Sequence, residues 1–221
     1  MQVQKPADQI ALKNLGVAVR ARLAADPTAY KFPLDSAEIY AVGDFLTPTE
    51  CAKFITMVDA SAKPSHAFNA EKFGKYRTSF SGDVDPFDPF VQMISRRIDD
   101  FLGLDPSFGE TVQGQRYEVG QEFRSHFDWF FTSDAYWPEQ RKRGGQRSWT
   151  AMIYLNDVAE GGGTEFTDLA ISVTPKRGSL LAWNNADPHG LVNSATRHAG
   201  LPVTQGSKYI ITKWYRTRRW S

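Results

Sequence analysis

The sequence has little cysteine and no long apolar segment. Cys51 is the one cysteine in 221 residues, so an intrachain disulfide is impossible and nothing indicates a cysteine-rich zinc site. No apolar run approaches the ~20 residues of a membrane-spanning helix. The N-terminal segment also lacks the apolar core of a signal peptide. We therefore expect a cytoplasmic protein without membrane contact, in which Cys51 is a small buried hydrophobe.

An excess of charge is also absent. Lysine and arginine total 26 and aspartate and glutamate 25, for a formal net charge of +1. This balance does not favour nucleic acid or an anionic membrane as a partner. The basic residues Arg216, Arg218 and Arg219 form a short C-terminal tail that we expect to be solvated. The remaining composition, 41% hydrophobic and 23% charged, is that of an ordinary globular protein.

The first half of the chain is mainly helical by its pattern. Thr47, Pro48 and Glu50 have the spacing of a helix N-cap followed by a capping box. Residues 61–86 are typical of a loop, with a turn at Gly82-Asp83. The predicted elements are a helix within residues 1–30 that ends at Asp26-Pro27, a strand at 39–42, a helix after Thr47 and a helix at 89–102.

The second half is rich in short β-forming segments, which alternate with glycine, proline and aspartate turns. Strands are predicted at 112–119, 122–128, 148–156, 163–167, 171–175, 179–184 and 207–217. Many short strands without intervening helices favour a jelly roll. We predict an α+β fold, with N-terminal helices packed against a double-stranded β-helix. A single domain would span 1–221, with a mainly helical part at 1–107 and the jelly-roll core at 108–221.

A polar segment interrupts the predicted strands at residues 131–146. It contains Pro138 and the pair Gly144-Gly145. We expect it to be a mobile loop that acts as a lid over a substrate, with the two glycines as its hinge.

The stretch RYEVGQEFRSHFDWF, residues 116–130, carries the first chemical signal. In an extended segment His126 and Asp128 point to the same face, whereas Phe127 points to the other. Two histidines and one carboxylate, with open positions, form the ligand set of non-heme Fe(II) oxygenases. The alternative is a surface histidine hydrogen-bonded to a nearby aspartate. Of the surrounding aromatics, Phe123, Phe127, Trp129, Phe130 and Trp183, only some can face a pocket.

A second histidine ligand has to come from elsewhere in the chain. His66 has no acidic or glycine-rich neighbours and is expected at the surface. His189 lies in the turn sequence Asp-Pro-His-Gly, where exposure is usual. His198 precedes a predicted strand that carries Lys208 ten residues later. From the residues alone both His189 and His198 remain candidates. Lys208 lies either on an exposed edge or, if buried, beside an anion.

Three segments together resemble the prolyl 4-hydroxylase family of 2-oxoglutarate- and Fe(II)-dependent dioxygenases. They are YEVGQEFRSHFDWF, GGQRSWTAMIYLNDVAEGGGTEF and HAGLPVTQGSKYIITKWY, and the match runs from about residue 76 to 217. The resemblance implies hydroxylation of an unactivated C–H bond, most simply in a prolyl residue of a peptide or protein, with release of succinate and carbon dioxide. It also implies Fe(II), 2-oxoglutarate, dioxygen and ascorbate as reductant.

The resemblance assigns roles to individual residues. His126, Asp128 and His198 would hold the iron, and Tyr117, Thr164 and Lys208 would contact 2-oxoglutarate. The positions that match peptide contacts of the family are Arg77, Ser79, Phe123, Arg147 and Trp214. Lys213, which alternates with Trp214, is expected to face solvent.

The chain departs from the family pattern at two positions. Phe123 stands where the family often has a tyrosine three residues before the first histidine, and Leu201 replaces a cysteine. The missing hydroxyl at Phe123 leaves the substrate open. A free amino acid or another small molecule is therefore an alternative substrate. A catalytically silent jelly-roll module that only binds or senses a ligand is an alternative of another class. The oligomeric state is not determined by the sequence.

Overall fold

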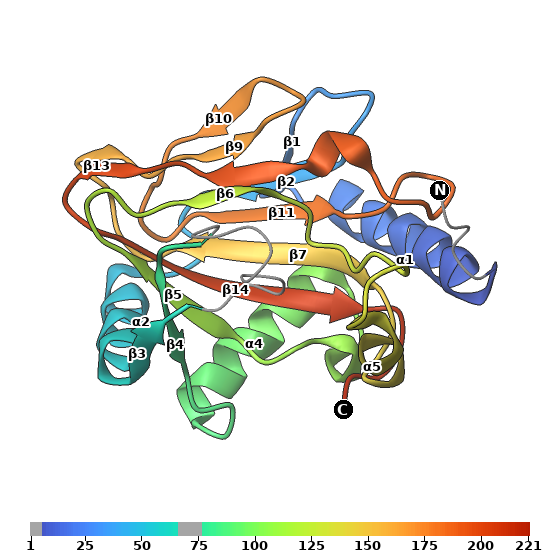
Figure 1. Ribbon diagram of the computed structural model, residues 1–221, viewed down its shortest axis with the longest axis horizontal. Helices are drawn as coiled ribbons and strands as arrows, with labels where there is room; N and C mark the ends of the chain where they lie inside the picture. The colour runs from blue at the N-terminus through green and yellow to red at the C-terminus, as the bar shows by residue number, and fades with distance from the viewer. Residues whose placement is uncertain (1–5, 66–76) are drawn as a thin grey trace.

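The computed structural model describes residues 6–65 and 77–221, so the expectation for His66 lies outside the described residues. Helices, a large sheet and a small sheet form successive layers (Figure 1). The α-helices are α1 (Pro6–Ala24), α2 (Pro48–Ser61), α4 (Pro89–Leu102) and α5 (Trp137–Lys142), with 3-10 turns η1 (Pro106–Phe108) and η2 (Ser194–Thr196). None of these helices is long and apolar enough to cross a membrane.

Two antiparallel sheets face each other. The eight-stranded sheet has the order β1 (Tyr30–Lys31), β2 (Ile39–Val42), β11 (Leu180–Asn184), β7 (Arg147–Tyr154), β14 (Lys208–Arg216), β5 (Gln113–Tyr117), β4 (Phe80–Asp83), β3 (Ala62–Pro64). The four-stranded sheet has the order β10 (Ile171–Val173), β9 (Thr164–Phe166), β12 (His198–Gly200), β6 (Phe123–His126), and β13 (Val203–Gln205) pairs with β8 (Glu160–Gly161). All seven strands predicted in the second half are present, each somewhat shorter than expected.

The helix predictions agree with the structure because their signals are local. Thr47 Oγ1 accepts from the backbone N–H of Glu50, and the Glu50 carboxylate accepts from the backbone N–H of Thr47, which completes the capping box. The third predicted helix is α4, and the first ends at Ala24, just before Asp26-Pro27. Cys51 is fully buried on α2 as expected.

Alternation along the strands divides the core into two parts. Odd-numbered residues of β14, such as Ile211 and Tyr215, pack against α2 and α4 on one face of the large sheet. Even-numbered residues, such as Ile210, face the small sheet. The interior between the two sheets is therefore where the even-numbered side chains Lys208, Thr212 and Trp214 lie.

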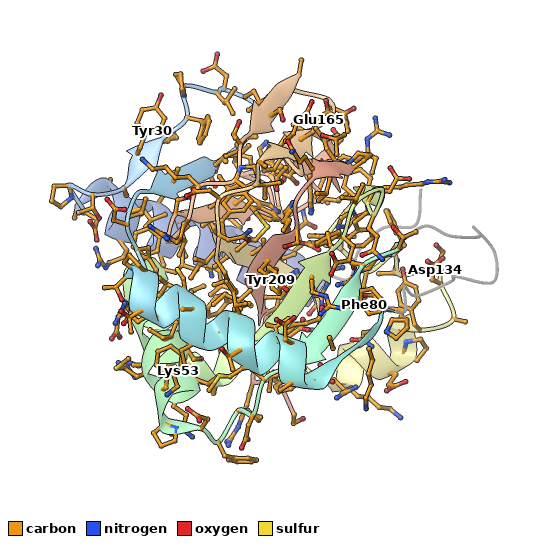
Figure 2. The ribbon with its side chains drawn as sticks, turned by 90° about the vertical axis from the view of Figure 1, so that its left-hand side faces the viewer. Tyr30, Lys53, Phe80, Asp134, Glu165 and Tyr209 are labelled. Carbon is orange, nitrogen blue, oxygen red and sulfur yellow. The ribbon has the colours of Figure 1, made fainter. Side chains whose placement is uncertain are left out.

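The expected loop at 61–86 is partly wrong, because Phe80–Asp83 is strand β4. Gly82 lies opposite Gly114 of β5 and not in a turn. A Cβ added to Gly114 would lie 2.3 Å from Cγ2 of Val58, and one added to Gly82 would lie 2.6 Å from the Val58 carbonyl oxygen. The glycine pair thus lets α2 approach the sheet closely. Figure 2 shows α2 lying across the strands that carry Phe80 and Tyr209.

The segment 131–146 contains helix α5 and is not a plain loop. Trp137 and Gln140 of α5 are buried. The carbonyl oxygen of Gly145 accepts a hydrogen bond from Arg216 Nη1 at 2.7 Å, and that of Gly144 accepts one from Thr217 Oγ1 at 3.2 Å. The two glycines expected as a hinge are therefore bonded to the end of the chain, and the lid role stays a prediction.

Two basic residues expected in solvent are buried, so those predictions are wrong. Lys213 is 3% exposed, and its ammonium group pairs with Asp99 of α4. Arg216 is also 3% exposed and pairs with Glu110 at 2.6 Å. In both cases a carboxylate distant in sequence compensates for the buried charge.

Candidate metal centre and its pocket

His126, Asp128 and His198 converge at one point between the sheets. His126 ends β6, and His198 begins β12 directly opposite it in the antiparallel pair. Nε2 of His126 lies 3.9 Å from Asp128 Oδ1, and Nε2 of His198 lies 3.8 Å from Asp128 Oδ2. The three potential ligand atoms lie within 4.8 Å of one another. The structure thus brings His198 to the predicted site, while His189 lies exposed in its turn.

Both imidazoles are oriented by backbone carbonyl groups. Nδ1 of His126 donates to the carbonyl oxygen of Arg124 at 2.9 Å, and Nδ1 of His198 donates to that of Thr196 at 3.0 Å. A carbonyl oxygen only accepts, so Nδ1 carries the proton and Nε2 keeps its lone pair. Burial, reinforced by the neighbouring His198, lowers the pKa of His126 to about 3. His126 is therefore neutral at physiological pH, as a metal ligand has to be.

Asp128 is held as a carboxylate. Burial alone would raise its pKa, but His198, His126 and Arg147 together lower the pKa below its usual value. Thr150 Oγ1 donates to Asp128 Oδ2 at 2.8 Å, and Asn185 Nδ2 donates to Thr150 Oγ1 at 2.9 Å. Two imidazoles oriented through Nδ1, one oriented carboxylate and supporting hydrogen bonds match the donor set that Fe(II) takes in non-heme sites.

A pocket extends from the triad to Lys208. Its lining includes the predicted residues Tyr117, Phe123, His126, Asp128, Thr164, His198, Lys208 and Trp214, together with Gln115, Met152, Trp183, Gly200, Ile210 and Thr212. Lys208 is 2% exposed, and burial lowers its pKa to about 7. Within residues 6–65 and 77–221 its ammonium group has no carboxylate partner. A buried cation of this kind is suited to bind a ligand anion.

Several polar side chains lie at or beside the pocket. The indole N–H of Trp183 is buried without a hydrogen-bond partner in the described part of the chain, and the Trp214 side chain interacts with the Asp128 carboxylate. The Tyr117 hydroxyl donates to Gln115 Oε1 at 2.7 Å, and Tyr154 donates to Thr164 Oγ1 at 2.7 Å. Sequence reasoning missed Gln115 and Thr212. Strand alternation predicts both, because Gln115 lies two residues before Tyr117 and Thr212 four residues after Lys208.

Three predicted substrate residues lie next to the pocket but do not line it. Arg147 is paired with Glu110 through Nε at 2.7 Å and Nη2 at 2.9 Å, and its guanidinium lies 4.0 Å from the Trp214 ring centre. Arg77 donates to Ser79 Oγ at 3.0 Å. Glu110 was missed, since no local pattern connects it with Arg147.

Phe123 contacts both the metal-ligand candidate His126 and Arg77. Its ring stacks on His126 with a centroid distance of 3.6 Å, and the Arg77 guanidinium lies 5.0 Å from its ring centre. Of the other aromatics around the triad, Trp183 lines the pocket, whereas Phe127 and Trp129 pack with Leu12 of α1.

Comparison with known proteins agrees with this geometry. The family model described as the 2OG-Fe(II) oxygenase superfamily matches residues 112–216. Probable prolyl 4-hydroxylase 8 of Arabidopsis thaliana is 32% identical over 203 residues, which are 80% of this chain and 68% of the relative. The chain belongs to the prolyl 4-hydroxylase family. Its members are 2-oxoglutarate- and Fe(II)-dependent oxygenases, as the residues at the triad predicted.

Other members of the prolyl 4-hydroxylase family show the extent of the likeness. Prolyl 4-hydroxylase subunit alpha-1 of Gallus gallus is 38% identical over 146 residues, 65% of this chain, but this chain spans only 28% of that relative. The viral collagen prolyl hydroxylase of Paramecium bursaria Chlorella virus-1, solved with 2-oxoglutarate, has a TM-score of 0.62 at 29% identity. That comparison covers 80% of this chain and 94% of the other, and it confirms the double-stranded β-helix.

Proposed function

We propose that the protein hydroxylates prolyl residues in a peptide or protein, with 2-oxoglutarate and dioxygen as co-substrates and succinate and carbon dioxide as products. The observation that carries the proposal is the convergence of His126, Asp128 and His198, with both Nε2 atoms free, at one end of a pocket that ends at Lys208. Family membership supplies the reaction class.

Different side chains would bind the metal and 2-oxoglutarate. His126, Asp128 and His198 would hold Fe(II), which when bound supplies the activation of dioxygen. Lys208 would pair with the distal carboxylate of 2-oxoglutarate, and Tyr117 would turn its hydroxyl from Gln115 to the same carboxylate. Thr164 lies on the same wall. The apolar side chains of Met152 and Ile210 would keep water out of the pocket.

The substrate would approach on the side of Phe123 and Trp214. Arg147 is available there as a preorganised donor, since Glu110 fixes its guanidinium plane. Arg77 lies against the ring of Phe123 and donates to the buried Ser79. The proposal includes ascorbate as reductant and a reducing compartment such as the cytoplasm, which the buried thiol of Cys51 suits.

The test is succinate formation from 2-oxoglutarate with Fe(II) and ascorbate, with mass-spectrometric detection of the hydroxylated residue. Proline-rich peptides are compared with the same peptides carrying alanine for proline. We expect succinate formation to rise with the proline peptides alone and to vanish in His126→Ala. Turnover that no proline peptide stimulates, yet that depends on His126, would favour a small-molecule substrate. No turnover with iron bound would favour the silent binding module.

The affinity for 2-oxoglutarate is expected to fall as pH rises above 7. Burial lowers the pKa of Lys208 to about 7, so the ammonium form that binds the dianion is complete below pH 7 and is lost above it. Binding then requires proton uptake, and Kd should rise roughly tenfold per pH unit above about 7.5. The measurement is calorimetric titration under anaerobic conditions with Mn(II) in place of iron, at pH 6 to 9.

The matched variant is Lys208→Arg, whose guanidinium keeps its charge throughout this range. Its Kd is expected to be independent of pH, whatever its absolute value. A wild-type Kd that does not change between pH 6 and 9, or the same slope in the variant, would show that Lys208 does not carry the dependence.

A further inference from the structure

Arg77 differs from the other arginines around the pocket, because its hydrogen-bond partners in the described residues are neutral. Its Nε donates to Ser79 Oγ at 3.0 Å and its Nη2 to Gln113 Oε1 at 3.4 Å. In residues 6–65 and 77–221 no carboxylate lies within ion-pair distance of its guanidinium. The neighbouring cations have acidic partners: Arg116 pairs with Asp59 and Glu118, Arg124 with Glu122, and Arg147 with Glu110.

The position of Arg77 connects this charge with the reaction site. Its guanidinium lies over the ring of Phe123, and that ring stacks on the metal-ligand candidate His126. Lys208, the cation suited to 2-oxoglutarate, lies inside the pocket, whereas Arg77 does not line it. The Arg77 guanidinium also acts on the hydroxyl of Tyr117, which lines the pocket, so Arg77 lies at the border of the pocket beside Phe123 and close to the metal-ligand candidates.

Phe123 provides no hydroxyl beside Arg77, at the position where the family often has a tyrosine. A phenyl ring offers no hydrogen bond, so a polar group of a substrate that lies against Phe123 is within reach of the half-buried Arg77 guanidinium. Of the ligand groups a guanidinium can bind, a carboxylate matches its planar donors and its charge. A half-buried cation without a carboxylate partner among residues 6–65 and 77–221 is stabilised when the ligand brings a carboxylate.

We propose, on the basis of the proposed hydroxylation, that the substrate presents a carboxylate to Arg77 next to the residue that is hydroxylated. The carboxylate has two sources, the side chain of a neighbouring aspartate or glutamate and the α-carboxylate of a C-terminal or free amino acid. Both sources offer the same chemistry to Arg77, and the substrates of the test distinguish them.

The test compares matched substrates in the succinate assay with hydroxylation confirmed by mass. One pair is a proline peptide with blocked ends that carries glutamate or glutamine beside the proline. The other is a peptide ending in proline as free acid or amide, with free proline alongside. We expect kcat/KM to be about 10- to 100-fold higher for the acid of one pair, and the responsive pair identifies the source.

Variants at Arg77 and Arg124 show whether a preference for acids depends on the Arg77 guanidinium or on positive charge near Phe123 in general. In Arg77→Gln the preference for the acid should disappear, because KM for the acid should rise by about the size of that preference more than KM for the amide does. Arg77→Lys should keep part of the preference. Arg124→Gln removes an equal charge next to Phe123, from a side chain already paired with Glu122, and should keep the whole preference.

The outcomes that overturn the inference are distinct from failure of the proposed function. If wild type hydroxylates acids and amides equally, or if Arg77→Gln slows both equally, the inference is wrong and prolyl hydroxylation stands. If no prolyl substrate is hydroxylated while 2-oxoglutarate is still consumed, both are wrong.

Discussion

Asp128→Ala is expected to abolish both iron binding and succinate formation. The carboxylate lies between the two imidazoles, 3.9 Å from one Nε2 and 3.8 Å from the other. Its loss leaves two ligands and removes the negative charge that offsets the metal ion. We expect iron content after anaerobic desalting to fall to background and succinate formation to fall by at least about 10³-fold, the scale of losing a group that the reaction requires.

A graded control is Thr150→Val, which has nearly the same shape. It removes the hydroxyl that donates to Asp128 Oδ2 and leaves the ligand itself. Loss of such a supporting hydrogen bond typically costs about 10- to 100-fold in metal affinity or activity. Asp128→Ala protein that keeps its iron and retains wild-type turnover would refute the triad as the metal site, provided that circular dichroism shows an unchanged fold.

Asp99→Ala is expected to be the most destabilising single substitution outside the metal site. Asp99 Oδ1 accepts from Tyr215 Oη at 2.6 Å and from Lys213 Nζ, which also donates to Ser95 Oγ at 2.7 Å. Both charged side chains are only 3% exposed. Removing the carboxylate leaves the ammonium buried and unpaired, which costs about 3–5 kcal/mol of the free energy of unfolding. Urea unfolding monitored by tryptophan fluorescence measures the loss.

The matched control is Asp100→Ala, the same substitution one residue later on α4. Asp100 pairs with Arg96, but the two side chains are 60% and 64% exposed. A pair at the surface contributes about 0.3–0.5 kcal/mol, so the two variants should differ by several kcal/mol. Equal losses would mean that helix propensity, and not the buried pair, sets the effect.

The deficit of Asp99→Ala should shrink as pH rises. Burial lowers the pKa of Lys213 in the folded protein, and Asp99 opposes that shift. Without Asp99 the folded state binds fewer protons than the unfolded chain, whose lysine titrates near ~10.4. Stability of the variant therefore rises with pH from its depressed folded pKa up to about pH 10. A deficit that stays constant between pH 7 and 10 would contradict an unpaired Lys213 as its cause.

Local signals in the sequence predicted helices α1, α2 and α4, the main strands and the ligand candidates His126 and Asp128. The capping box at Thr47 and the apolar stripe of 89–102 act within a few residues, so tertiary contacts did not alter them. His126 and Asp128 are two residues apart, and the distance from His198 to Lys208 carried the resemblance to the family. The substrate contacts at Arg77, Ser79, Phe123, Arg147 and Trp214 stay predictions.

The tertiary structure decided which faces are buried and which charges are paired. Lys208 and Lys213 lie on the same strand, but one faces the small sheet and the other faces α4. Alternation along β14 predicts that the two lysines lie on opposite faces of the large sheet, but it does not show that both faces are buried. Gly82 has the sequence of a turn but lies in β4 through its pairing with Gly114 of β5, and its missing side chain leaves room for Val58. Glu110 pairs with Arg147 and Arg216, which are distant from it in the sequence and close to it only in the tertiary structure. The sequence by itself thus predicted the pair of His126 and Asp128, because spacing over two residues encodes it, whereas His198 reaches that pair through the pairing of β12 with β6. The partners of the buried charges depend on contacts between segments far apart in the chain, which no local pattern records.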